Sequence, residues 1–249
     1  MRNMMKKISI ALLCAFLPLS AQAAGGGNTN LEHVEIRLND THSLQNGAKI
    51  FVNYCLGCHS ADYMRYNRLS EDLDIPEEIV LRDMISSDAK IGDPMTAIMP
   101  VKKSAEWFGV APPDLSLTGR LRDAKWLYNY FISFYVDPES VSGWNNTVFE
   151  NVAMPHALAD LQGRRTAVFT EEDGVKKFDR FEVLTEGQMS DEEFKSAMKD
   201  LTGFLVYVGE PVKLKRVKYG IYVMLFLFVL AVLSWMLKKE YWRDIKSSH

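Results

Sequence analysis

Two cysteines and a histidine form the most chemically specific pattern in this chain. Residues 55–59 read C-L-G-C-H, and C-x-x-C-H is the attachment sequence for a c-type haem. The thiols of Cys55 and Cys58 are one helical turn apart, so both can add to the vinyl groups of one haem and form thioethers. His59 then lies under the porphyrin, where a ring nitrogen can bind the iron. The pattern therefore predicts one covalently bound haem c with His59 as a metal ligand.

Other sites that use paired cysteines fit the sequence less well. A thioredoxin-like redox pair and half of a zinc site both contain C-x-x-C. Neither of them requires the adjacent His59, and this sequence offers no second cysteine pair to complete a zinc site. Haem attachment is therefore the favoured interpretation.

An iron bound by His59 on one side needs a ligand on the other. Methionine thioether is a common sixth ligand in c-type cytochromes and raises the reduction potential. Met99 and Met154 each precede a proline, which keeps the local backbone out of a helix. The residue types leave Met154 and Met99 nearly equal as candidates, with His156 behind them.

The N-terminal residues have the composition of an export signal. Three basic residues in positions 1–7 precede an apolar run, and residues 21–23 read A-Q-A, a small-x-small cleavage pattern. We expect residues 1–23 to be a signal peptide, which takes Cys14 with it when it is removed. The haem domain is then expected outside the cytoplasm.

The C-terminal part predicts one membrane span. Residues 219–237 carry no charge and suit a transmembrane helix of about 28 Å. Residues 211–218 read as a basic linker and residues 238–249 as a cytoplasmic tail. Four basic residues flank the span on each side, so the positive-inside rule does not set its orientation. The expected signal peptide sets the orientation of the span, because it places residues 24–210 on the periplasmic side of a bacterial inner membrane.

The expected exported domain is acidic. Residues 24–210 hold 18 basic and 30 acidic side chains, a net charge of −12. Such a surface favours a basic protein partner and argues against nucleic acid, although acidity also aids solubility.

Helical periodicity dominates this domain. A helix starting at Ser43 brings Cys55 in at its end, and a helix from Asp123 presents an aromatic face as far as Phe134. Ser190 and Glu193 form a capping box for a last soluble helix.

A short hairpin interrupts the helical pattern. Residues 167–169 and 181–184 can pair as strands around a turn at 171–174. The expected fold is mainly α: a c-type cytochrome domain with a short β-hairpin-like insertion and one C-terminal transmembrane helix.

Several of these motifs together resemble the cytochrome c1 family, the haem subunits of quinol–cytochrome c reductase, along nearly the whole mature chain. C-x-x-C-H alone indicates c-type haem, and the P-P-D-L-S element with the C-terminal anchor makes the resemblance specific. The matching segments are C-L-G-C-H-S at 55–60, Y at 63, Y-N-R-L at 66–69, A-P-P-D-L-S at 111–116, A-M-P-H at 153–156 and the helix of residues 188–211.

The resemblance implies roles for individual residues. It makes Met154 the sixth iron ligand, places Pro113 and Leu115 against the haem, and puts Arg120 near a haem propionate. A guanidinium can pair with a carboxylate through two hydrogen bonds, which suits the role of Arg120. Residues 70–111 are shorter and more mixed in charge than the acidic stretch of mitochondrial members, so the acceptor's docking surface does not carry over.

The resemblance also implies an electron-transfer subunit rather than an enzyme in its own right. Its partners would be the cytochrome b and iron–sulfur subunits of the same complex, with the iron–sulfur subunit as electron donor and a c-type cytochrome as acceptor. No catalytic triad, phosphate-binding loop or paired carboxylate site stands out in the sequence. The alternatives are a membrane-tethered haem enzyme or sensor, and a tethered cytochrome of another respiratory complex.

Overall fold

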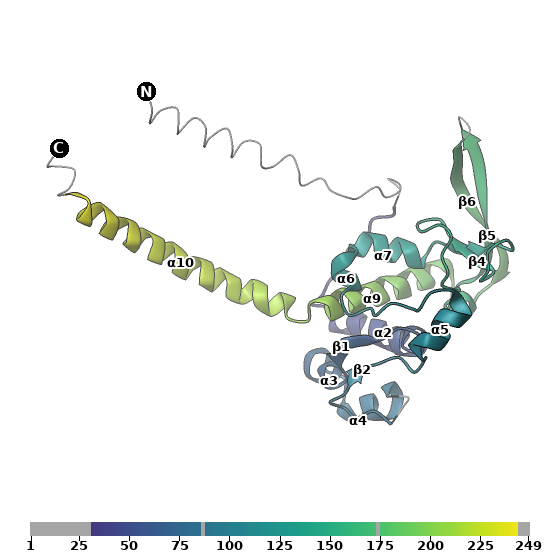
Figure 1. Cartoon of the computed structure of the whole chain (residues 1–249), viewed down its shortest axis with the longest axis horizontal. Helices are drawn as coiled ribbons and strands as arrows, with labels where there is room; N and C mark the ends of the chain where they lie inside the picture. The colour runs from purple at the N-terminus through teal and green to yellow at the C-terminus, as the bar shows by residue number, and fades with distance from the viewer. Residues whose placement is uncertain (1–30, 86–87, 173–174, 244–249) are drawn as a thin grey trace. The chain divides into compact units, whose positions relative to one another are not determined.

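Two helices far apart in the sequence form the centre of the domain. In the computed structural model, α2 (Thr41–Ile50) packs against α9 (Asp191–Gly209). Figure 1 shows α9 between α2 and α7 (Ala124–Phe131), and both neighbours contact it. The core that these helices share is apolar and includes Leu44, Ala48, Phe51, Leu127, Phe131, Met198, Leu201 and Phe204.

The structure describes residues 31–85, 88–172 and 175–243. The expected signal peptide, residues 1–23, lies outside the described residues, and so does the end of the expected cytoplasmic tail. Residues from Glu32 onward form one unit.

Helix α2, which leads to the cysteines, starts at Thr41 and not at Ser43 as the sequence suggested. Asp40, not Ser43, is its N-cap, since an Asp40 carboxylate oxygen accepts a hydrogen bond from the Ser43 backbone N–H at 3.1 Å. The Ser43 hydroxyl instead donates to Asp200 on α9. After α2 the chain continues as a π-helical segment, η2 (Phe51–Cys55), so the prediction that this helix ends at Cys55 is confirmed.

The aromatic helix after Asp123 is shorter than expected. Asp123 caps α7 as predicted, because its carboxylate accepts from the Trp126 N–H at 2.6 Å. The helix ends at Phe131, however, and Phe134 belongs to strand β3 (Phe134–Val136), which pairs with β4 (Trp144–Asn146). The helical assignment of Phe134 was wrong because this residue pairs with Asn146 on β4, and strand pairing takes the place of the next helical turn. Arg165 also donates to the Phe134 carbonyl.

The capping box and the hairpin are both confirmed. Ser190 and Glu193 exchange hydrogen bonds at the start of α9. Strands β5 (Gly163–Glu172) and β6 (Val175–Glu186) are antiparallel and longer than predicted.

Shorter elements complete the domain. Strand β1 (Ala61–Arg65) pairs with β2 (Pro94–Met95), directly after the haem motif. The remaining short helical segments are α3 (Asn67–Leu73), α4 (Glu77–Ile79), η3 (Val80–Met84), α5 (Val101–Phe108), α6 (Thr118–Leu121) and α8 (Ala159–Gln162). The fold is mainly helical with a hairpin, as the sequence predicted. The antiparallel pairs β1–β2 and β3–β4 were not predicted.

The C-terminal helix is long and apolar. α10 (Lys213–Tyr241) has a mean hydropathy of 2.4 in its apolar window, and none of that window is buried in the protein. It is long enough to cross a membrane. The helix also takes in most of the segment 211–218, where a basic linker was expected.

Candidate functional site: a haem pocket

One pocket brings together four of the residues singled out in the sequence, Cys58, His59, Met154 and Pro113. Cys58 and His59 follow η2, whereas Met154 comes from the loop before α8, and all three line the same pocket as Pro113. The rest of the lining is almost entirely apolar and consists of Tyr54, Phe108, Val110, Ala111, Pro112, Ala153, Pro155 and Ala157. Such walls suit a flat apolar macrocycle with ligands on both faces.

The C-x-x-C-H segment forms a tight turn at the end of η2. The Cys55 carbonyl accepts hydrogen bonds from the backbone N–H of Cys58 at 3.0 Å and of His59 at 2.8 Å. Burial raises the pKa of the Cys55 thiol to about 12, and burial also raises that of Cys58. Redox-active cysteines need lowered thiol pKa values, so this environment does not favour a thioredoxin-like pair.

His59 is oriented by a backbone carbonyl. Its Nδ1 lies 2.8 Å from the carbonyl oxygen of Pro113. A carbonyl can only accept, so Nδ1 carries the proton and Nε2 keeps its lone pair for a metal. Burial lowers the pKa of His59, against smaller opposing effects of the Pro113 hydrogen bond and the Asp114 charge. The imidazole is therefore neutral at pH 7, as a metal ligand must be.

The P-P-D-L-S element is fastened to the chain that follows His59. The Leu115 N–H donates to the Ser60 carbonyl at 2.7 Å, and the Asp62 N–H donates to the Asp114 carboxylate at 2.9 Å. These contacts hold the Pro113 carbonyl in place beneath His59. The P-P-D-L-S element thus orients the His59 ring through the backbone carbonyl of Pro113.

Met154 has a hydrogen-bonding partner that sequence analysis missed. The hydroxyl of Tyr130, on α7, donates to the Met154 Sδ at 3.4 Å. Burial raises the pKa of Tyr130 well above its usual value, so the hydroxyl keeps its proton. In the sequence Tyr130 looked like one more member of an apolar helix face, and no local signal linked it to a distant methionine.

The two other candidate axial ligands, Met99 and His156, are not in the described lining of this pocket. The Met99 backbone N–H nevertheless donates to the carbonyl of Gly57, within the C-x-x-C-H segment, at 3.2 Å. The His156 ring is buried, stacks on Phe134 at 4.7 Å between ring centroids, and places Nε2 2.8 Å from the Gln162 side-chain amide. His156 is thus a core residue whose ring nitrogen already has a partner.

Arg120 and Leu115 are not brought into the described lining of the pocket. Arg120 is exposed on α6, alongside Gly209 at the end of α9. A hydrogen bond from Arg216 lowers the pKa of Glu210, and the positive charge of Arg120 is a further cause that lowers it. The Leu115 side chain is half-buried and packs against the main core.

The residues of the pocket fit haem c. An imidazole nitrogen and a thioether sulfur, the two axial donors typical of c-type cytochromes, lie in one apolar pocket with the Cys58 thiol. Cys55, one turn earlier, is buried in the main core and is not in the described lining. Among the described residues no cluster of three or more His, Cys, Asp or Glu side chains could hold a metal ion. An imidazole and a thioether are the pair of donors that fits a macrocycle supplying the remaining ligands.

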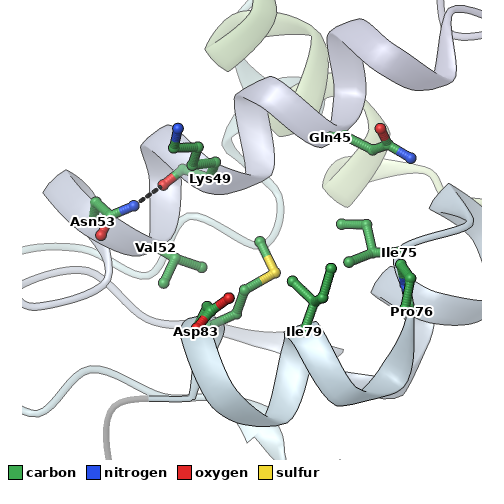
Figure 2. A pocket seen from close by; sticks show the side chains of 9 residues that line it. Gln45, Lys49, Val52, Asn53, Ile75, Pro76, Ile79 and Asp83 are labelled. Atoms are coloured by element: carbon green, nitrogen blue, oxygen red, sulfur yellow. Dashed lines mark hydrogen bonds between the residues drawn. The ribbon is translucent and has the colours of Figure 1, made fainter.

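A second pocket has different chemistry. Figure 2 shows apolar side chains, Val52, Ile75 and Ile79, between α2–η2 and α4–η3, with Asn53 donating to the Lys49 carbonyl. Its described lining contains neither Cys nor His. Nothing in it corresponds to the haem donors.

Comparison with known proteins settles the family. Residues 35–245 match the Cytochrome C1 family. The chain belongs to the cytochrome c1 family. It is 45% identical to cytochrome c1 of Allochromatium vinosum, over 97% of this chain and 100% of that protein. It is 24% identical to cytochrome c1 of Cereibacter sphaeroides, over 98% of both chains.

One similar protein has a different name. The ammonia monooxygenase gamma subunit of Nitrosomonas europaea is 43% identical, over 97% of this chain and 100% of that protein.

Membership in the cytochrome c1 family makes this chain a haem-based electron-transfer subunit of a cytochrome bc1 complex, not a catalyst by itself. α10 is then its membrane anchor.

Proposed function

We propose that this cytochrome c1 holds one haem c through thioethers at Cys55 and Cys58, with His59 and Met154 as the axial ligands. It would take electrons from the iron–sulfur subunit of quinol–cytochrome c reductase and pass them to a c-type cytochrome. The observation that carries the proposal is the shared apolar pocket of Cys58, His59 and Met154. When bound there, haem c supplies a one-electron couple at its iron.

The residues around the pocket suit electron transfer rather than substrate chemistry. His59 is held by the Pro113 carbonyl, and Met154 by the Tyr130 hydroxyl, so both proposed iron ligands would be held in fixed positions. Pro113 and Val110 line the pocket and are also exposed to solvent. The pocket therefore reaches the surface, where a partner protein can approach.

The remaining site residues keep roles that follow from the family. We propose Arg120 as the partner of a haem propionate, with Pro113 and Leu115 lying against the haem. The domain of residues 24–210 would lie on the periplasmic side of a bacterial inner membrane, beside the cytochrome b and iron–sulfur subunits. α10 would cross the membrane once, and residues 238–249 would stay in the cytoplasm.

Two methionine variants test the axial ligation. Met154→Leu keeps most of the apolar volume but removes the sulfur, so the fold should survive while the iron loses its thioether. The haem should then bind carbon monoxide and fall in reduction potential. Met99→Leu is the matched control and should do neither. An exchange of these phenotypes would make Met99 the ligand, and ready binding of carbon monoxide by the unmodified protein would favour a haem enzyme or sensor.

A second function is suggested by the similarity to a protein named as an ammonia monooxygenase gamma subunit. The chain would then be a tethered cytochrome of another complex. Mild detergent extraction followed by affinity purification of the full chain separates the two possibilities. Co-purification with a b-type cytochrome and an iron–sulfur protein supports the bc1 assignment, and their absence beside other stable partners contradicts it.

A further inference from the structure

Tyr130 is held in a fixed position next to Met154. Its ring stacks on Trp126, with centroids 5.2 Å apart and planes at 11°, and meets the ring of Phe134 edge-on at 5.1 Å. The side chain therefore has little freedom to turn its hydroxyl away from the Met154 sulfur, which lies 3.4 Å away.

The backbone of Tyr130 is tied to the same loop that carries Met154. The Asn146 side chain is fully buried and donates to the Tyr130 carbonyl at 2.8 Å. Its amide oxygen accepts from the N–H groups of Val148 and Phe149, which begin the loop toward Met154. One buried amide thus sets the distance between α7 and this loop.

We propose that Tyr130 is a positioning residue that orients the Met154 thioether toward the iron and raises the reduction potential of the haem. The proposal rests on the proposed function, in which Met154 binds iron. A thioether sulfur has two lone pairs, so one can bind iron while the other accepts the tyrosine hydrogen bond. That bond withdraws electron density from the sulfur, which weakens its donation and favours ferrous iron.

Removal of one hydroxyl group tests the proposal. Tyr130→Phe retains the ring and its packing, so the haem should remain six-coordinate and low-spin. The equilibrium constant for haem reduction should fall about threefold, or ~28 mV, since tenfold is 59 mV for one electron. Tyr128→Phe removes a hydroxyl from a buried tyrosine on the same helix whose hydroxyl interacts with Glu32 rather than with Met154, and should leave the potential unchanged.

A double-mutant cycle shows whether Tyr130 acts through the sulfur. In the Met154→Leu background no sulfur is present to accept, so adding Tyr130→Phe should not change the potential further. An unchanged potential in the single Tyr130→Phe variant would overturn the proposal, as would an equal fall in both backgrounds. If Met154→Leu itself leaves the spectrum and potential unchanged, the ligation by Met154 fails, and the role of Tyr130 fails with it.

Discussion

The crossing of α2 and α9 predicts opposite effects for two glycine-to-alanine substitutions. Gly47 lies where α2 comes closest to α9. A Cβ atom there would overlap the Asp200 carbonyl oxygen and lie 2.7 Å from both the Asp200 carbonyl carbon and the Phe204 Cβ. A backbone carbonyl cannot rotate away as a side chain can, so Gly47→Ala must push the helices apart.

The size of the effect follows from these distances. Ordinary contact begins at 3.4 Å, so the two 2.7 Å contacts require the helices to separate by at least 3.4 − 2.7, or 0.7 Å, and the overlap with the Asp200 carbonyl oxygen requires more. A gap of that size removes a quarter to a half of the dispersion attraction across it. Overpacking costs about 3 kcal/mol, against a gain of about 1 kcal/mol from replacing a helical glycine. The net loss is about 2 kcal/mol, which lowers the midpoint of thermal unfolding by about 4–8 °C.

Gly203, on the α9 side of the same interface, is the matched control. A Cβ there would meet Ile36 and Leu44 side-chain carbons at 3.5 and 3.6 Å, which are ordinary contacts. Gly203→Ala should therefore stabilise the protein by up to about 1 kcal/mol. Thermal unfolding of the full chain in detergent, followed by far-ultraviolet circular dichroism, measures both variants. Equal stability of Gly47→Ala and the unmodified protein would refute the argument from close backbone approach.

Two further predictions concern the haem and one buried charge. With thioethers at Cys55 and Cys58, the haem should stay with the polypeptide after denaturation and acid–acetone extraction, and quantitative release would contradict covalent attachment. Burial alone would raise the pKa of Asp72, but hydrogen bonds from Tyr207 and Arg68 outweigh it, so its pKa lies below the usual value. The charge then stabilises the fold above pH ~4 and loses this effect as the pH falls below that value. Asp72→Asn should lower stability in urea near neutral pH, with the deficit shrinking in acid; a deficit independent of pH would assign it to packing.

Several features of this protein could be predicted from the sequence because they depend on residues close together in the chain. The C-x-x-C-H motif needs two thiols and an imidazole within five consecutive residues. The caps at Asp123 and Ser190 act within three residues, and the apolar anchor is set by composition. Two short apolar segments on either side of a turn at residues 171–174 were enough to predict the β5–β6 pairing.

Features that depend on distant segments could not be read in this way. By residue type Met99 and Met154 were nearly equal, and only packing brings Met154 to the pocket of His59. Phe134 follows a helical pattern, yet it pairs in a strand with Asn146, which lies beyond the end of that pattern. The Tyr130 hydroxyl meets the Met154 sulfur because α7 and the later loop pack together. Local patterns thus determined the cofactor and most helices, whereas tertiary packing decided which side chains surround the iron site, because those contacts exist only once the chain is folded.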